Sequence, residues 1–207
     1  MPWILATIYD RFMRASEEAC LIEWRKGLLS KASGKTLEIG AGTGANLNCY
    51  PSHISDLTLL EPDPAMARRL KKRLIESPFP QATICSDSAS KLPFPDNHFQ
   101  TVVSTLVLCS IPDQGQALQE IRRVLKPGGA FLFLEHGAAP ENSSRYHWQQ
   151  RLEPFWKWGV GGCHLTRRAD QDIEKARLTI EDLQRESMRK ALPITRPTVR
   201  GLARKAL

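Results

Sequence analysis

Residues 36–47 read TLEIGAGTGANL, and this stretch decides the fold of the chain. A short apolar run ends at Ile39 and passes directly into a loop that contains Gly40, Gly42 and Gly44. Glycine has no Cβ, so such a loop can turn tightly and bring its backbone close to a ligand. A strand followed by a glycine-rich turn is typical of the first unit of a doubly wound α/β sheet. We therefore expect a ligand site directly after this strand.

The same alternation of short apolar runs and helical segments continues along the chain. The predicted strands are 36–39, 57–60, 82–85, 100–107 and 130–135, and residues 178–207 supply a closing pair. The predicted helices are 45–50, 64–76, 114–124 and 144–158, and residues 125–129 form a sharp break. Alternating strands and helices imply β-α-β units and a mostly parallel sheet covered on both faces. The fold class is therefore doubly wound α/β.

The beginning of the chain is predicted to be helical. Residues 4–31 carry apolar side chains at helical spacing, and Gly34 ends the segment. We expect an N-terminal helical lid at residues 1–33 and one ligand-binding domain at residues 34–207. The first residues have no basic region and the chain has no run of eighteen apolar residues, which predicts neither a secretory signal nor a membrane span. The expected location is cytoplasmic.

Charge and cysteine content exclude several classes of protein. The five cysteines are scattered and never paired as C-x-x-C, which argues against a disulfide scaffold and against a zinc site. Of the net charge of +7, residues 141–207 hold +6, with 14 basic and 8 acidic side chains. This basic part carries no aromatic interleaving of the kind that single-stranded nucleic acids require, so we expect no nucleic-acid partner. Peripheral contact with anionic membranes stays open.

An acidic residue stands where a ribose would be held. Glu61 ends the second predicted strand, about twenty residues after the glycine loop, and a carboxylate can accept hydrogen bonds from both ribose hydroxyls. Gly40, Gly42 and Ala45 also satisfy the G-x-G-x-x-G/A pattern of dinucleotide sites. From these residues alone, a nicotinamide-dependent dehydrogenase is an open alternative.

Three later features narrow the choice of cofactor. Residues 86–88 (SDS) follow the third strand, 92–99 (LPFPDNHF) lead into the fourth, and 125–129 (LKPGG) precede the fifth. In this order, the region 35–135 resembles the class I S-adenosylmethionine-dependent methyltransferases. The resemblance implies a Rossmann-like sheet of seven strands and S-adenosyl-L-methionine as cofactor, with the loop from Glu38 along its methionine part, Glu61 on its ribose, and Asp87 with Ser88 at its adenine. The expected cofactor-binding residues are Tyr9, Glu38, Gly40, Ala41, Gly42, Glu61, Pro62, Asp87, Ser88 and Leu106.

The resemblance extends further toward one branch of that family. Residues 104–110 (STLVLCS), 134–136 (LEH), 148–150 (WQQ) and 162–167 (GCHLTR) look like the branch that contains the mammalian microsomal alkyl-thiol methyltransferases. We expect this chain to lack the apolar N-terminal membrane anchor of that branch. The implied activity is direct in-line methyl transfer to a small, fairly apolar thiol. A phospholipid or small-molecule amine methyltransferase and a non-catalytic cofactor-binding protein are the alternatives.

The acceptor side of the site is predicted from a few residues. A thiol reacts as its thiolate, and a free thiol has a pKa of about 8.5, so His136, at the end of the fifth strand, is the expected catalytic group that helps to deprotonate it. Trp148 and Trp156 lie on one face of a predicted helix, which either walls an apolar acceptor pocket or packs on the sheet. We expect Cys163 to be a pocket or structural thiol, and no metal ligands.

Overall fold

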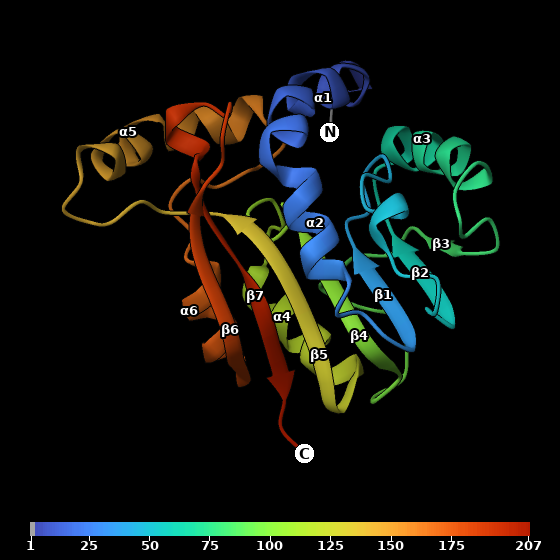
Figure 1. Cartoon of the computed structure of the whole chain (residues 1–207). Coiled ribbons are helices and arrows are strands. Elements are labelled where there is room, and N and C mark those ends of the chain that lie inside the picture. Colours follow the sequence, from blue (N-terminus) through green and yellow to red (C-terminus); the bar gives the residue numbers. More distant parts are fainter. Residues whose placement is uncertain (1–2) are drawn as a thin grey trace.

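A seven-stranded sheet lies at the centre of the computed structural model, which describes residues 3–207, with side chains from residue 10 onward (Figure 1). The strand order is β3-β2-β1-β4-β5-β7-β6; pairing is parallel from β3 to β5, and β7 runs antiparallel to both β5 and β6. The predicted doubly wound, mostly parallel α/β fold is therefore confirmed. The strands are β1 (Lys35–Ile39), β2 (Asp56–Leu60), β3 (Thr83–Cys85), β4 (Phe99–Thr105), β5 (Leu125–His136), β6 (Leu178–Ser187) and β7 (Pro197–Lys205).

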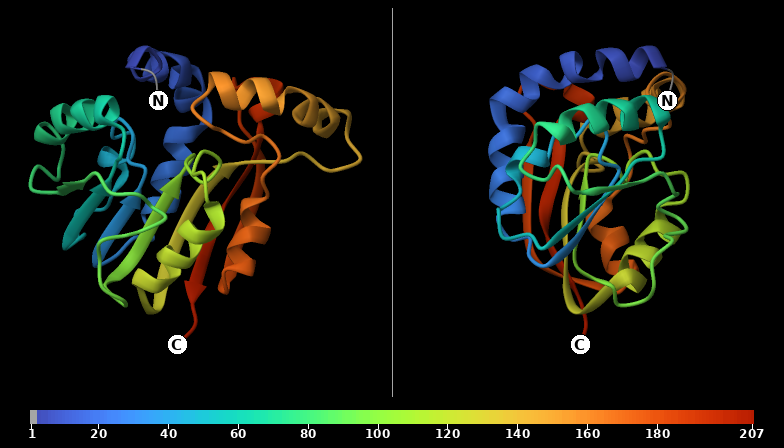
Figure 2. Two further views of the ribbon diagram at one scale, coloured as in Figure 1. Left: turned by 180° about the vertical axis from the view of Figure 1, so that it is seen from behind. Right: turned by 90° about the vertical axis from the view of Figure 1, so that its right-hand side faces the viewer.

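Helices cover both faces of the sheet and the edge at which its parallel strands end. Figure 2 shows α2 on one face, α4 and α6 on the other, and α1, α3 and α5 beyond the carboxyl ends of the strands. The helices are α1 (Trp3–Ser16), α2 (Ile22–Leu29), α3 (Pro64–Ile75), α4 (Gln114–Val124), α5 (Ser144–Gly159) and α6 (Ala169–Lys175). A π-helical segment (Glu17–Leu21) joins α1 to α2, and short 3-10 turns occupy Leu47–Cys49 and Pro193–Thr195.

The two faces of the sheet bury separate hydrophobic clusters. Successive side chains of a strand point to opposite faces, and β5 shows this clearly. Its residues Leu132 and Leu134 join the cluster of α2 and α3, whereas Phe131 and Phe133 join the cluster of α4 and α6. All four side chains are fully buried. The sheet is therefore a rigid support for the loops at its carboxyl edge.

Two predicted elements differ from the structure. The predicted helix at 45–50 is a series of turns that ends in the 3-10 segment Leu47–Cys49. Tyr50 is extended, with ψ of 142°, because the following Pro51 disfavours helical backbone at the residue before it. The predicted break at 125–129 is instead the beginning of β5, where the ladder with β4 shifts its register and Gly128 takes a φ of +70°.

Most of the first 33 residues pack into the core of the domain and do not form a separate lid. Cys20, Leu21, Trp24 and Leu28 are buried in the same cluster as the sheet residues, so the π-helical segment and α2 are part of the core. Of the elements in this N-terminal segment, α1 is the one that extends beyond the carboxyl edge of the sheet (Figure 1). The boundary at residue 33 and a closing motion remain predictions, and the motion concerns α1. Within the described residues, no helix is both long enough and apolar enough to cross a bilayer.

Candidate functional site

The reversal of strand order places the site. β1 lies between β2 and β4, so successive strands run outward in opposite directions from the β1–β4 pair. Ligands of open α/β sheets bind outside the carboxyl ends of the strands at such a switch point. Two loops meet there, residues 40–46 after β1 and residues 106–111 after β4.

The glycine loop is shaped by close packing on one side and open space on the other. Gly40, Gly42 and Gly44 have φ values of +62°, +59° and +88°, a region that favours glycine. A Cβ at Gly40 would lie 2.5 Å from Val107 Cγ2, so this position requires glycine. Among the described residues, a Cβ at Gly42 would meet only the Gly40 carbonyl oxygen, at 4.0 Å. The described part of the chain therefore leaves room over Gly42 for the predicted methionine part of a cofactor.

Glu61 lies on the β2 side of the glycine loop and holds that loop in place. Its buried carboxylate accepts the Gly42 N–H through Oε2 at 2.7 Å and the Asp63 N–H through Oε1 at 2.8 Å. Burial raises the pKa of Glu61, against the lowering effect of these two hydrogen bonds. Each carboxylate oxygen keeps acceptor capacity, so ribose hydroxyls fit here. The neighbouring Pro62 is exposed, and Ala41 donates its N–H to the Leu60 carbonyl at 2.9 Å, which ties the loop to β2.

Glu38 belongs to a buried polar network that the sequence did not reveal. Its two carboxylate oxygens accept hydrogen bonds from Asn46 Nδ2 at 2.9 Å and Tyr50 Oη at 2.8 Å. Arg25 of α2 donates to Asn46 Oδ1 and to Thr105 Oγ1, both at 2.8 Å. Burial raises the pKa of Glu38 to about 7, although the Tyr50, Asn46 and Arg25 interactions oppose that rise. The network connects the loops after β1 and β4 to α2.

The predicted adenine residues lie on an exposed loop at the end of β3. Asp87 and Ser88 are exposed, and Asp87 Oδ2 accepts a hydrogen bond from Cys85 Sγ at 2.8 Å. The Glu61 N–H donates to the Cys85 carbonyl at 2.8 Å, so the two loops leave neighbouring strands side by side. Asp87 is thus in line with Glu61 and the glycine loop along one edge, as the prediction requires.

Leu106 is held in a strained conformation between β4 and β5. Its φ is +60°, which is costly for a residue with a side chain and concentrates at functional sites. The Leu106 N–H donates to the Leu134 carbonyl at 2.7 Å. Beside it, the buried Glu135 accepts the N–H groups of Val107 and Leu108 at 2.9 and 3.1 Å. The loop after β4 is therefore fixed by β5.

α1 is tied to the glycine loop by Asp10. The Asp10 carboxylate accepts from Thr43 Oγ1 at 2.6 Å and from Arg73 Nη2 of α3 at 2.5 Å. One side chain thus joins α1, the loop after β1, and α3. The side chain of Tyr9 lies outside the described residues, so its predicted contact with the methionine end of the cofactor stays a prediction.

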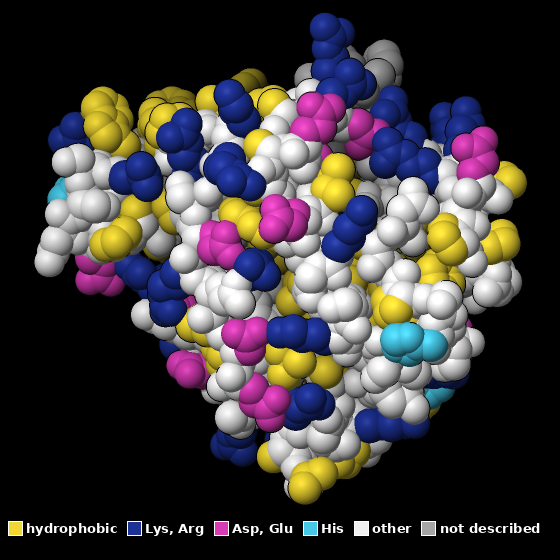
Figure 3. Space-filling view, viewed as in Figure 1, with side chains coloured by type: hydrophobic (Ala, Val, Ile, Leu, Met, Phe, Trp, Pro, Cys, Tyr) yellow, Lys and Arg dark blue, Asp and Glu magenta, His cyan; other side chains and the backbone are white. Residues whose placement is uncertain are grey.

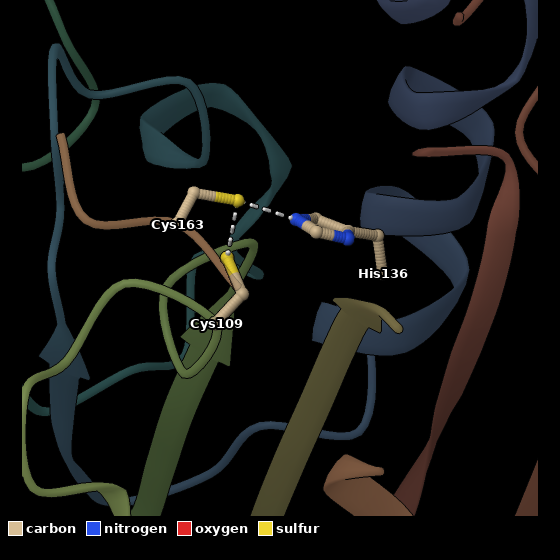
Figure 4. A group of neighbouring side chains, drawn as sticks. All are labelled: Cys109, His136 and Cys163. Atoms are coloured by element: carbon tan, nitrogen blue, oxygen red, sulfur yellow. Dashed lines mark hydrogen bonds between the residues drawn. The ribbon is translucent and has the colours of Figure 1, made fainter. Parts of the chain in front are cut away.

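His136 lies, as predicted, at the end of β5, and the fold brings it together with two cysteines (Figure 4). His136 Nε2 is 3.0 Å from Cys163 Sγ, which is 3.6 Å from Cys109 Sγ. All three side chains are buried, and His136 Nδ1 has no hydrogen-bond partner among the residues that the structure describes. Burial lowers the pKa of His136, but the contact with Cys163 raises it on balance. The prediction against a metal site rested on the spacing of the cysteines, and the fold removes that basis.

α5 turns its aromatic face outward. Trp148, Phe155 and Trp158 are 55%, 76% and 92% exposed, and Trp156 is partly covered. Hydrophobic and basic side chains alternate on this part of the surface (Figure 3). The helix is held instead by the buried Gln149, which accepts from Ala139 N and donates to two backbone carbonyls. The expected alternative, packing of this face on the sheet, is wrong, and the role of Trp148 and Trp156 in acceptor binding stays a prediction.

Comparisons with known proteins agree with this geometry. A family model described as a methyltransferase domain matches residues 37–133. Thiol S-methyltransferase TMT1B of Rattus norvegicus is 37% identical over 188 residues, which cover 88% of this chain and 77% of that protein. Human thiol S-methyltransferase TMT1A is 37% identical over 175 residues, covering 83% and 71%. A putative methyltransferase structure from Bacillus halodurans C-125 superposes with a TM-score of 0.74 at 16% identity, covering 91% and 100% of the two chains, which shows the shared fold.

Proposed function

The chain belongs to the S-adenosylmethionine-dependent methyltransferase family that includes thiol S-methyltransferases TMT1A and TMT1B, and we propose that it methylates the sulfur of a small, fairly apolar thiol. The observation that carries this proposal is the composition of the loop after β4, which we expect to face the methyl acceptor. Residues 106–111 (LVLCSI), which follow β4, offer no acid or amide side chain to bind an amino group. Apolar and sulfur-containing side chains suit a thiol better than an amine.

The residues of the switch point supply binding and orientation. S-adenosylmethionine, when bound, supplies an electrophilic methyl group on its sulfonium. The open side of Gly42 and the Glu38 network would hold its methionine part, Glu61 its ribose, and Asp87 with Ser88 its adenine. In-line displacement depends mainly on the alignment of nucleophile and methyl group, so rigid loops are the contribution that this chain can make. The buried network of Arg25 provides that rigidity.

His136 is proposed to promote ionisation of the acceptor thiol. It lies at the end of β5 on the same edge of the sheet as the cofactor residues, and a thiol must lose its proton to become the nucleophile. The His136→Ala variant should therefore lose activity mainly with weakly acidic thiols, because acidic thiols are already ionised at neutral pH. Rates over thiols of graded acidity, measured on both proteins, test this role. An equal loss for all thiols would make His136 a structural residue.

A direct assay tests the proposed reaction. Purified protein is incubated with S-adenosylmethionine and with small thiols, amines or phenols, and release of S-adenosylhomocysteine is measured. We expect turnover with apolar thiols, a rate that rises with pH toward the pKa of each thiol, and a methyl thioether product identified by mass spectrometry. Turnover of amines with no turnover of thiols would refute the proposal.

The outward face of α5 favours a second candidate, methylation of an amine carried by a membrane lipid. Its exposed aromatic side chains and the nearby Arg145, Arg151 and Lys157 suit the interface of an anionic bilayer. Sedimentation with anionic and neutral vesicles tests the surface. The double variant Phe155→Ser, Trp158→Ser should lose vesicle binding, and Ile75→Ser, which removes another exposed apolar side chain, is the control. Equal binding of all three proteins would remove this candidate.

A further inference from the structure

The fold gathers three soft donor atoms in one buried place. Cys109 follows β4, His136 ends β5, and Cys163 lies in the loop after α5 (Figure 4). Cys109 Sγ, His136 Nε2 and Cys163 Sγ lie within 4.8 Å of one another, and the three residues are 4%, 7% and 6% exposed. Figure 4 shows that the three side chains point toward one common position from three separate segments.

These distances suit a tetrahedral zinc ion. With Zn–S bonds of about 2.3 Å and Zn–N bonds of about 2.0 Å, ligand atoms stand about 3.5–3.8 Å apart. The Cys109–Cys163 distance of 3.6 Å already matches, and His136 Nε2, 3.0 Å from Cys163 Sγ, has to move back by roughly half an ångström. The three donor atoms, now within 4.8 Å of one another, thus reach this spacing by small side-chain movements. Thiolate and imidazole donors select zinc rather than magnesium or calcium.

Hydrogen bonds hold the three segments in this arrangement. The His164 N–H donates to the Cys109 carbonyl at 2.8 Å, which ties the two cysteine loops together. Arg167 Nη1 donates to the carbonyls of Leu108 and Ile111 at 2.6 and 2.7 Å. On the other side, Glu135 of β5 binds the N–H groups of Val107 and Leu108, next to Cys109. Backbone clamps of this kind preorganise a ligand set.

We propose that Cys109, His136 and Cys163 bind a zinc ion whose fourth position takes the sulfur of the acceptor thiol. Among the described residues the cluster offers only these three ligands, and three protein ligands with one open position characterise catalytic rather than structural zinc. The thiol releases its proton to solvent as its sulfur binds the metal, so it is held as a thiolate at neutral pH. This role rests on the proposed function, and His136 then promotes ionisation through the metal.

Metal content tests the site independently of activity. Protein is loaded with zinc and desalted, and its metal content is measured by elemental analysis. In a second sample cobalt(II) replaces zinc, and its absorption spectrum identifies the atoms that bind the metal. We expect about one metal per chain and a thiolate-to-cobalt charge-transfer band in the wild type. Both should be lost in Cys109→Ser and Cys163→Ser, and Cys49→Ser is the matched control that keeps them. Affinity for S-adenosylhomocysteine, unchanged in all variants, verifies the fold. A wild type without bound metal, or one with a Cys109–Cys163 disulfide instead, would overturn the site.

The open position is tested on the cobalt protein without cofactor. A small apolar thiol should strengthen the charge-transfer band as its sulfur binds, and an amine of the same shape should leave the spectrum unchanged. A cobalt spectrum that does not respond to thiols would overturn the acceptor role of the metal. If the spectrum responds and no thiol is methylated, the metal site stands and the proposed function fails.

Discussion

Glu61 offers the sharpest test of the cofactor site. Its carboxylate is buried and is fixed by the N–H groups of Gly42 and Asp63, so it cannot be replaced by water without loss. A hydrogen bond to a charged group contributes about 1.5–3 kcal/mol, and in the proposed site two ribose hydroxyls donate to this carboxylate. The Glu61→Ala variant should therefore bind cofactor more weakly by at least about 3 kcal/mol, which raises Kd more than about 100-fold. Glu61→Gln keeps one acceptor and should lose about half of that free energy.

The assay is isothermal titration calorimetry with S-adenosylhomocysteine, which avoids turnover. Glu181→Gln is the matched control, because Glu181 lies on the distant edge strand β6 and forms an ion pair with Arg204, at 2.8 Å, with both side chains well exposed. Its Kd should stay at the wild-type value. If Glu61→Ala keeps its fold by circular dichroism and its Kd also stays at the wild-type value, the ribose assignment is wrong.

Three further predictions follow from the loops around the site. Asp10→Asn loses the ion pair from α1 to Arg73 of α3 and weakens the hydrogen bond that Asp10 accepts from Thr43. The dissociation rate of S-adenosylhomocysteine, measured by stopped flow, should therefore rise several-fold, and an unchanged rate would mean that α1 is not a lid. Burial raises the pKa of Glu38 to about 7, so the unfolded state ionises first and the stability that Glu38 contributes at low pH is lost as pH rises toward 7. In urea titrations without cofactor, Glu38→Gln should remove up to about 3 kcal/mol of the wild-type decrease in stability, and Glu135, whose pKa burial also raises to about 7, should cause a decrease that persists. Gly40→Ala should lower the melting temperature more than Gly42→Ala, because only the new Cβ at Gly40 meets Val107. Gly42→Ala should mainly weaken cofactor binding. Equal melting temperatures of the two variants would contradict this.

Local sequence signals were sufficient to predict that the proposed cofactor-binding residues lie along one edge of the sheet. The glycine loop, Glu61 and Asp87 each follow a strand directly, and strand ends of a parallel sheet share one edge, so strand order alone placed them together. The acceptor side depends on contacts between distant segments. Cys109 and Cys163 are separated by 54 positions and meet only because the loop after α5 folds back on the loop after β4. No periodicity in the sequence reports such a contact.

Two further features escaped prediction for a related reason. Arg25 and Asn46 look like ordinary polar residues of a helix and a turn, and their burial depends on how α2 lies on the sheet. The apolar stripe of α5 was visible, but helical spacing gives only the face and not what the face meets. Gln149 lies two helical turns before Trp156, at the margin of this stripe. It decides the outcome, because its side chain is fully buried among backbone groups.

The π-helical segment between α1 and α2 determines how α1 is rotated about its own axis. Each α-helical residue advances about 100° around the axis, so an extra residue accommodated in a wide turn rotates everything before it by about that angle. α2 is fixed by its core side chains, and Glu17–Leu21 therefore sets the azimuth at which Asp10 faces Thr43. Removing one residue from this segment would turn Asp10 away by more than a quarter of a revolution. The number of residues in this segment, rather than their chemical type, thus sets which face of α1 is turned toward the glycine loop.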